Sequence, residues 1–300
     1  MRFERVAIIG LGLLGGSLGL ALHEHAPDIT TTGFDADPAT RKRAAELGLV
    51  GNVTETAADA VADADLVILC VPVGAMAQAA RDIADALPAN AVISDVGSSK
   101  ASVQKALAEA LPGHTCIPAH PVAGTEQSGP DAGFASLFEG RWCILTPPDG
   151  APEDAVTKLS DLWERLGAKV EIMDAEHHDL VLAVTSHIPH LIAYTIVGTA
   201  SDMEDVTRSE VIKYSAGGFR DFTRIAASDP VMWRDVFLNN RDAVLEMLGR
   251  FTEDLTALQR AIRSGDGDTL HDLFSRTRAI RRSIIDEGQD DASPDFGRDH

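Results

Sequence analysis

The 300-residue chain is short of positive charge, and this shortage excludes several kinds of partner. It has 26 Lys and Arg residues and 46 Asp and Glu residues, which gives a formal net charge of −20. An acidic surface repels phosphate backbones and anionic membranes, so neither nucleic acid nor a membrane is expected as a partner. An anionic substrate would be repelled too, so binding a carboxylate would require a local cluster of arginines.

The chain also has few cysteines and no long uninterrupted apolar run. Cys70, Cys116 and Cys143 form no C-x-x-C pair and lie in apolar stretches. This pattern predicts buried free thiols in a reducing compartment rather than a reactive nucleophile. The apolar stretch Val6–Leu22 imitates a signal peptide, but five glycines interrupt it. No segment has the roughly 18 uninterrupted apolar residues of a transmembrane helix, and we expect a cytoplasmic protein.

Up to about residue 173, short β-branched apolar runs alternate with amphipathic helical patterns. Buried strands joined by such helices predict βαβ units and a mostly parallel sheet. The expected helices include Ala75–Leu87 and Ser102–Leu111. The expected strands are Val6–Ile9, Thr30–Asp35, Leu66–Cys70, Val92–Val96, Cys116–Ala119, Cys143–Thr146 and Lys169–Ile172.

After residue 174 the strand patterns stop, and this change gives the domain boundary. We expect an α/β domain over 1–174, an all-α domain over 175–288 and a disordered polar tail over 289–300. Long apolar helices bury more surface by pairing with another subunit, so a homodimer through the C-terminal helices is expected. The expected helices are Glu176–Ala200, Asp205–Tyr214, Pro230–Ala261 and Asp268–Asp286.

The run GLGLLGGS, which begins at Gly10, is a G-x-G-x-x-G motif between an expected strand and an expected helix. In a Rossmann domain the first glycine permits a tight turn, the second lets the backbone approach a pyrophosphate, and the third allows close helix packing. Asp35 ends the second strand about twenty residues after Gly15, where an acidic residue binds the adenosine ribose. Its carboxylate would repel a 2′-phosphate, so NAD is preferred over NADP. Arg41 and Arg43 are the alternative phosphate ligands, but both lie inside the next helical pattern.

The remaining cofactor contacts are expected where other strands end. Val71 and Pro72 follow the third strand and would line the adenosine side of the crevice, whereas Ser98 follows the fourth strand, where the nicotinamide is expected. The expected NAD-binding residues are Gly10, Gly12, Leu13, Leu14, Gly15, Asp35, Val71, Pro72 and Ser98.

Several histidines lie outside the glycine motif. His120 opens the segment HPVAGTE after the fifth expected strand. His187 and His190, in SHIPH, are three residues apart but have no third ligand nearby in sequence, so no metal is expected. His177 and His178 are interpreted as an exposed helix start.

A pair of arginines is the most informative charged feature of the second half. Arg220 and Arg224, in the segment GGFRDFTRIA, lie four residues apart on one helix face. Like charges at that spacing repel unless an anion lies between them, so the pair indicates an anion site.

These motifs together resemble the prephenate/arogenate dehydrogenase family, also called cyclohexadienyl dehydrogenases. GLGLLGGS, DVGSSK, HPVAGTEQSG, SHIPH and GGFRDFTRIAASDPVMW occur in the family's order over roughly residues 5 to 285. The resemblance implies a Rossmann domain followed by a helical dimerisation domain. It also implies NAD-dependent oxidative decarboxylation of prephenate or arogenate in tyrosine biosynthesis, without a metal.

The resemblance further implies roles for individual residues. His120 would accept the proton of the substrate's ring hydroxyl, and Ser98 would position that hydroxyl and the imidazole. Arg224 would grip the ring carboxylate through its guanidinium. The residues implied around the side-chain end of the substrate are His190, Thr125, Glu126, Gly217, Arg220 and Trp233.

Several points stay open at this stage. Glu126 would accept a hydrogen bond from the ammonium group of arogenate, or it would pair with Arg220, so the preferred substrate is undecided. Strictness for NAD and inhibition by tyrosine are open as well. The chain shows no added regulatory or chorismate mutase segment, so we expect a monofunctional enzyme. The alternatives are a β-hydroxyacid dehydrogenase or imine reductase, for which Lys213 lies in no matching motif, and a non-catalytic NAD sensor.

Overall fold

The computed structural model describes residues 2–202 and 217–286. Contacts divide the chain into two compact units, Met1–Val244 and Leu245–His300. The helix expected over Asp205–Tyr214, the residue Lys213 and the tail expected over 289–300 lie outside the described residues.

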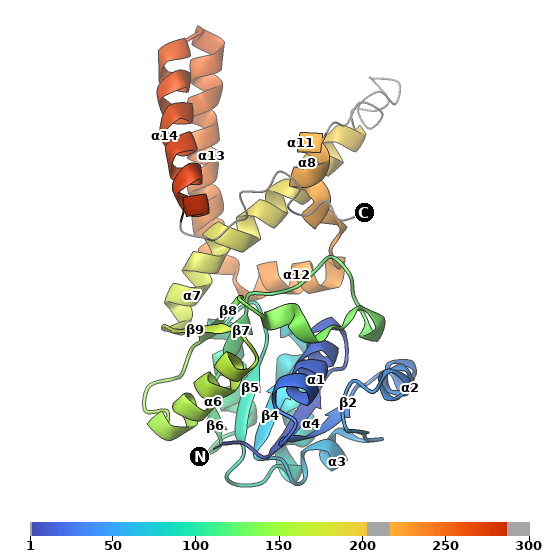
Figure 1. Ribbon diagram of the computed structural model, residues 1–300. Helices are drawn as coiled ribbons and strands as arrows, with labels where there is room; N and C mark the ends of the chain where they lie inside the picture. The colour runs from blue at the N-terminus through green and yellow to red at the C-terminus, as the bar shows by residue number, and fades with distance from the viewer. Residues whose placement is uncertain (1, 203–216, 287–300) are drawn as a thin grey trace. The chain divides into compact units, whose positions relative to one another are not determined.

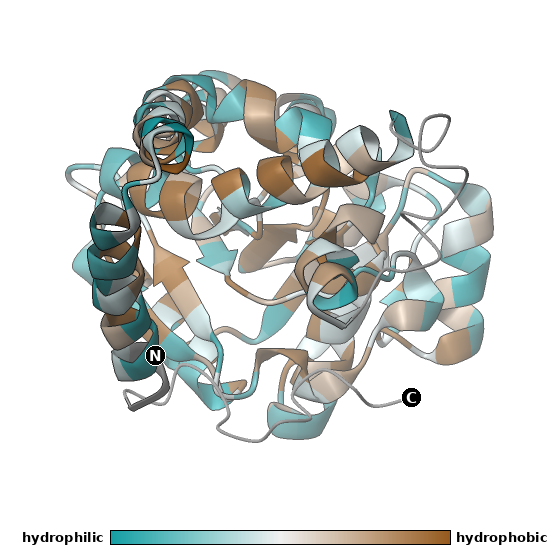
Figure 2. Cartoon of the chain, turned by 90° about the horizontal axis from the view of Figure 1, so that it is seen from above, coloured by the Kyte–Doolittle hydropathy of each residue, from teal (hydrophilic) through white to brown (hydrophobic). Residues whose placement is uncertain are grey.

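The first unit is built on a six-stranded parallel sheet of strand order β3-β2-β1-β4-β5-β6 (Figure 1). This is the Rossmann order, in which the direction of winding reverses beside β1 and opens a crevice at the carboxyl ends of the strands. The strands β1 and β4 are almost wholly buried, and Figure 2 shows brown, hydrophobic residues along the strands of the sheet. The bounds are β1 Arg5–Ile9, β2 Thr30–Phe34, β3 Asn52–Val53, β4 Leu66–Leu69, β5 Val92–Asp95 and β6 Thr115–Cys116.

Helices cover both faces of this sheet, so its strands need apolar residues on both sides. Ile8 of β1 belongs to a core cluster with side chains of α1 and α6. Its neighbours Ala7 and Ile9 belong to a second cluster with side chains of α3, α4 and α5. The helix bounds are α1 Leu13–His25, α2 Pro38–Leu47, α3 Ala57–Val61, α4 Met76–Ile83, α5 Ala101–Ala110 and α6 Glu153–Arg165.

A second sheet of three strands corrects the expectation of one strand over Cys116–Ala119. In the structure, β6 ends at Cys116 and β7 (Ala119–Pro121) begins a separate sheet with β8 (Trp142–Leu145) and β9 (Lys169–Ile172). β7 is antiparallel to β8, and β8 is parallel to β9. Pro118 lies at the break, where its missing N–H cannot continue a ladder of hydrogen bonds. The break moves His120 out of the large sheet and onto β7.

The helix expected over Glu176–Ala200 is interrupted. α7 (Ala175–Leu182) continues through a π-helical turn, η5 (Ala183–His187), into α8 (Ile188–Asp202). Pro189 has no N–H to donate to a carbonyl of the preceding turn, which explains the local widening, and such turns are frequent at functional sites. By length and composition the run Ala175–Asp202 is apolar enough to cross a membrane, although polar residues interrupt it and the sequence alone shows no continuous apolar stretch there.

The helix expected over Pro230–Ala261 is two helices, α12 (Pro230–Asn239) and α13 (Arg241–Ser264), because Asn240 has non-helical dihedral angles and uses its side chain elsewhere. α14 (Gly267–Asp286) follows α13 after a turn in which Gly265 has φ +70°. α11 spans Gly217–Thr223. Short 3-10 turns lie at η1 Val73–Ala75, η2 Ala84–Ala86, η3 Pro130–Ala132, η4 Ala135–Phe138 and η6 Arg224–Ala227.

Candidate active site

The glycine loop between β1 and α1 has the space that a dinucleotide requires. Gly10 has φ +99°, and a Cβ there would lie 2.4 Å from the carbonyl oxygen of Cys70 and 3.1 Å from Val71. A Cβ on Gly15 would lie 1.8 Å from the carbonyl oxygen of Gly10, so this position must stay bare for the helix to pack. Nothing lies within 4 Å of a Cβ on Gly12, which leaves open space where a pyrophosphate would approach.

The loop also has N–H donors that no side chain caps, and hydrogen bonds hold the carboxylate of Asp35 in place beside it. No side chain caps the N-terminus of α1, which leaves its first N–H groups for a phosphate, and Leu13 and Leu14 begin this helix half-buried. One carboxylate oxygen of Asp35 accepts the N–H of Leu11 at 2.8 Å, and the other accepts the N–H of Asp37 at 2.9 Å. Asp35 therefore stands at the loop, and this cradle fits NAD.

Both arginines near Asp35 are occupied by other partners. Arg41 donates to the backbone carbonyl of Asp35 at 2.8 Å and lies over the ring of Phe34. Arg43 bonds to the carboxylate of Asp131 at 2.6 Å. Pro72 is exposed and Val71 is half-buried directly after β4.

A buried ion pair, Asp95 with Lys100, joins the end of β5 to the start of β7. The carboxylate of Asp95 accepts the N–H of Gly97 at 2.7 Å and that of Ala119 at 3.2 Å. The ammonium of Lys100 bonds to Asp95 and donates to the carbonyl of Ala119 at 2.6 Å. Burial raises the pKa of Asp95 and lowers the pKa of Lys100, and the opposite charge of the partner acts against both shifts. The pair thus holds the residues that precede Ser98 and His120, a function that the sequence analysis missed.

His120 itself is almost fully buried on β7 and bonds to a second histidine. Its Nδ1 lies 2.8 Å from Nε2 of His178, and Nδ1 of His178 lies 2.9 Å from the carboxylate of Asp179. Burial lowers the pKa of His120 well below its ordinary value, and the neighbouring His178, Lys100 and His187 lower it further. His120 is therefore a neutral imidazole at pH 7.

His178 corrects the interpretation of an exposed helix start, because its side chain is fully buried. The signal was present in the sequence: Ala175, His178, Asp179 and Leu182 recur at helical spacing and form the buried face of α7. His177 beside them is exposed, as expected.

A third buried histidine, His187, lies in the π-helical turn. The amide nitrogen of Asn240 is 3.0 Å from Nδ1 of His187 and donates to the carbonyl of Asp179 at 2.8 Å. Burial lowers the pKa of His187 to about 4. An interaction with the backbone of Ser98 raises this pKa and partly opposes the effect of burial. Ser98 is half-buried, and within residues 2–202 and 217–286 no hydrogen bond joins its hydroxyl to His120.

His190 and Trp233 connect this cluster to an arginine. Their rings stack with centroids 3.6 Å apart, and the charge of Arg224 contributes to a lowered pKa of His190, of which burial is the main cause. Arg224 donates to the carboxylate of Glu126 at 3.0 Å. The structure thus brings Glu126, His190, Arg224 and Trp233 into one chain of contacts.

The other predicted substrate residues are placed around this chain of contacts. Glu126 pairs with Arg224, which decides against a pair with Arg220, and Arg220 is exposed on α11. Gly217 begins α11, and the hydroxyl of Thr125 accepts the N–H of Gln127 at 3.1 Å. Among the described residues, no group of three or more His, Cys, Asp or Glu side chains could hold a metal ion.

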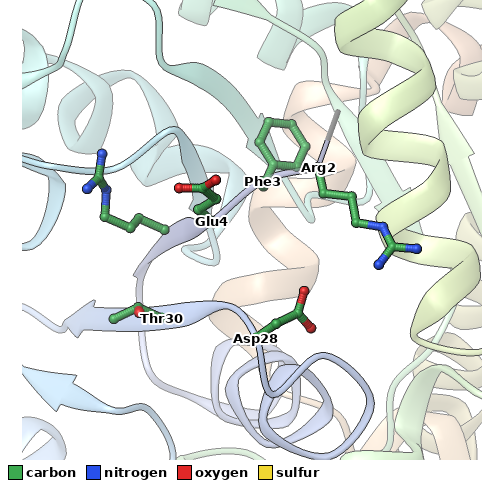
Figure 3. Close-up of a pocket in the computed structure, with 6 residues that line it drawn as sticks. Arg2, Phe3, Glu4, Asp28 and Thr30 are labelled. Carbon is green, nitrogen blue, oxygen red and sulfur yellow. The ribbon is translucent and has the colours of Figure 1, made fainter.

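The hollow drawn in Figure 3 lies elsewhere. Its volume is about 460 Å³, and it is lined by Arg2, Phe3, Glu4, Arg5, Asp28 and Thr30. Arg5 and Thr30 are the first residues of β1 and β2, so this hollow lies at the amino ends of the strands. The glycine loop lies at their carboxyl ends. We do not assign it to the active site, because ligands of such sheets bind at the carboxyl ends of the strands.

Rossmann topology, an open glycine loop and a buried neutral histidine define a nicotinamide-dependent dehydrogenase by class. The family model described as prephenate dehydrogenase, nucleotide-binding domain, matches residues 18–172, and the one described as prephenate dehydrogenase, dimerization domain, matches residues 174–276. The chain belongs to the prephenate dehydrogenase family.

Individual relatives resemble the chain over nearly its whole length. It is 47% identical to a cyclohexadienyl dehydrogenase of Zymomonas mobilis, over 94% of this chain and 96% of the relative. It is 31% identical to a prephenate dehydrogenase of Bacillus subtilis, over 94% of this chain and 76% of that protein. A prephenate dehydrogenase of Aquifex aeolicus, solved in complex with hydroxyphenyl propionate and NAD+, has a TM-score of 0.88 and 32% identity, over 95% of this chain and 99% of that chain.

Proposed function

We propose that the protein is an NAD-dependent dehydrogenase that oxidatively decarboxylates prephenate, arogenate or both. The products are 4-hydroxyphenylpyruvate or tyrosine, together with CO2 and NADH, and the pathway is tyrosine biosynthesis. The observation that carries this proposal is His120, a buried neutral imidazole in a chain whose relatives are named for these reactions.

The chemistry requires one base and a positioned carboxylate. The substrate ring carries a hydroxyl and a carboxylate, and NAD, when bound, accepts the hydride from the hydroxyl-bearing carbon. His120 takes the hydroxyl proton, and its low pKa keeps the lone pair available at pH 7. Loss of CO2 then makes the ring aromatic, His120 returns the proton to the ring oxygen, and aromatisation drives the reaction without a metal. Ser98, beside His187, orients the hydroxyl.

Arg224 binds the ring carboxylate through its guanidinium. Its present partner, Glu126, is then released to face the side-chain end of the substrate. His190, Thr125, Gly217, Arg220 and Trp233 line that end.

NAD binds at the glycine loop of Gly10, Gly12 and Gly15. Leu13 and Leu14 supply the helix N-terminus for the pyrophosphate, and Asp35 binds the adenosine ribose. Val71, Pro72 and Ser98 line the crevice. NAD is preferred over NADP because the Asp35 carboxylate repels a 2′-phosphate and because Arg41 and Arg43 already have acidic or carbonyl partners.

The domain organisation that we propose is 1–174 for NAD, 175–288 for dimerisation and substrate, and a polar tail over 289–300. A homodimer is supported by the match to a dimerization domain and by exposed apolar side chains on the C-terminal helices, among them Leu245, Leu255, Ile262, Phe274 and Ile280. A cytoplasmic location is supported by three unpaired cysteines. Neither a membrane nor a nucleic acid is proposed as a partner, since the net charge is −20.

The test is an absorbance assay for NADH with purified protein, NAD and either prephenate or arogenate. Turnover of one or both is expected, and the relative kcat/KM gives the preferred substrate. Binding of NAD without turnover of either compound would contradict the proposal and favour a sensor. Turnover of a 3-hydroxy acid instead would favour a β-hydroxyacid dehydrogenase.

A further inference from the structure

We infer that His178 and Asp179 form a positioning pair that sets the tautomer of His120, leaving a bare lone pair on Nε2 to accept the substrate's proton. The inference deepens the proposed function and rests on it for the role of His120. Asp179, a residue of α7, makes hydrogen bonds that cross to the N-terminus of α5.

Asp179 is fixed as an acceptor by the backbone. Its carboxylate accepts the N–H of Lys100 at 2.7 Å and that of Ala101 at 3.0 Å, 79 and 78 residues earlier in the chain. It thereby caps α5, which has no side-chain cap of its own. Its third neighbour, Nδ1 of His178 at 2.9 Å, must then be the donor of the hydrogen bond between them.

A neutral imidazole carries one proton, so the position of the proton on His178 determines its position on His120. With the proton of His178 on Nδ1, its Nε2 is an acceptor. The atom that faces this acceptor at 2.8 Å is Nδ1 of His120, which must therefore carry the proton of that ring. The other nitrogen of His120, Nε2, is left with its lone pair, and among the described residues no hydrogen bond occupies it.

The same contacts stabilise the ring after proton transfer. When Nε2 of His120 takes the proton of the substrate hydroxyl, the ring becomes a cation that carries a proton on each nitrogen. Nδ1 still donates to His178, whose own ring is polarised by Asp179, so the new charge faces acceptors. No other proton has to move in this step.

The burial of all three side chains makes the pairing specific. His120 is 7% exposed, His178 is fully buried and Asp179 is 5% exposed. Water therefore cannot replace a lost acceptor at little cost, and a His120 ring without His178 would have to rotate or change tautomer.

The first experiment measures the tautomer directly by 15N NMR of the full chain labelled at histidine, without substrate. The His120 signals are identified by their loss in His120→Asn. We expect the proton on Nδ1 in the wild type and its transfer to Nε2 in His178→Phe, which has no acceptor. A wild-type His120 protonated on Nε2 would overturn the inference without need of any variant, as would an Nδ1 tautomer that survives in His178→Phe.

The second experiment separates positioning from general damage to the fold. In His178→Phe, kcat should fall about 10- to 100-fold with little change in KM, as for loss of a hydrogen bond to a charged group. His178→Gln keeps an acceptor near the same place and should recover most of kcat, whereas His177→Phe, exposed on the same helix, is the control. Equal losses in His178→Gln and His178→Phe would contradict a role through the acceptor. If the wild type turns over neither substrate, the proposed function fails, whereas the tautomer is still decided by NMR.

Discussion

The guanidinium of Arg224 donates a 3.0 Å hydrogen bond to the carboxylate of Glu126, 98 residues earlier in the chain. The carboxylate of Glu126 thus occupies the guanidinium that is proposed to bind the substrate's ring carboxylate. A substrate anion must therefore displace Glu126 before it can bind. The pair makes the choice between prephenate and arogenate a question that one substitution can address.

We expect Glu126→Gln to change the preference between the two substrates. Arg224 loses its competing carboxylate for either substrate, whereas arogenate alone also loses an acceptor for its ammonium group. The ratio of kcat/KM for the two substrates should shift toward prephenate by about 10-fold or more, as for one charged hydrogen bond. The control is Asp242→Gln, an exposed acid of α13. An unchanged ratio would remove Glu126 from substrate selection.

Replacing His120 by Asn should lower kcat by about 10²–10⁴, because general base catalysis of this kind contributes that much. KM should change little, since the hydroxyl proton is transferred only in the reaction step. His177→Asn, exposed on α7, is the control, and steady-state NADH formation is the measurement. Full turnover in His120→Asn would disprove the proposed base.

Substitution of Asp35 by Ser should weaken selection for NAD. Its carboxylate contacts the glycine loop through Leu11, and it is proposed to bind the ribose hydroxyls. We expect kcat/KM for NAD to fall about 10- to 100-fold and that for NADP to rise. Glu109→Gln, an exposed acid of α5 that pairs with Lys105, should leave the ratio unchanged. A wild-type preference for NADP would contradict the assignment at once.

Acid should destabilise the fold through its buried histidines. Burial lowers the pKa of His187 to about 4, against 6.5 in the unfolded chain, so below pH 6.5 the unfolded chain binds a proton that the folded chain excludes. The stabilising contribution is complete above pH 6.5 and is lost as the pH falls toward 4. Between pH 7 and 4.5 the loss from this group is about 2–3 kcal/mol.

Urea unfolding at the two pH values measures this effect. His187→Gln should show a smaller loss of unfolding free energy than the wild type, and His177→Gln, exposed nearby, should behave like the wild type. Identical pH dependence in His187→Gln and the wild type would mean that the ring is not buried as described.

The ion pair of Asp95 and Lys100 should be a strong determinant of stability. Both side chains are fully buried, so Lys100→Met leaves an uncompensated carboxylate in the core. The free energy of unfolding should fall by about 3–5 kcal/mol, measured by urea denaturation. Lys105→Met, on the exposed side of α5, should change it by less than about 1 kcal/mol. Similar losses for both variants would mean that the pair contributes nothing special.

Local sequence patterns were enough to predict most strands of the fold and the cofactor loop. Apolar runs of β-branched residues placed six of the observed strands within one or two residues, and the glycine motif identified the loop after β1. They failed where one residue interrupts a longer pattern: Pro118 splits a strand, Pro189 widens a helix and Asn240 ends one. Each of these changes depends on hydrogen bonds that a hydropathy pattern does not encode.

The site shows the same division. Motifs alone singled out His120, Asp35 and Arg224, since each lies in a segment typical of a family and its chemistry is readable from residue type. The burial of His178, the acceptor role of Asp179 and the pair of Asp95 with Lys100 arise only where α5, α7 and β7 meet. A pKa and a tautomer depend on which groups surround a ring and how much water reaches it, and those neighbours come from distant parts of the chain.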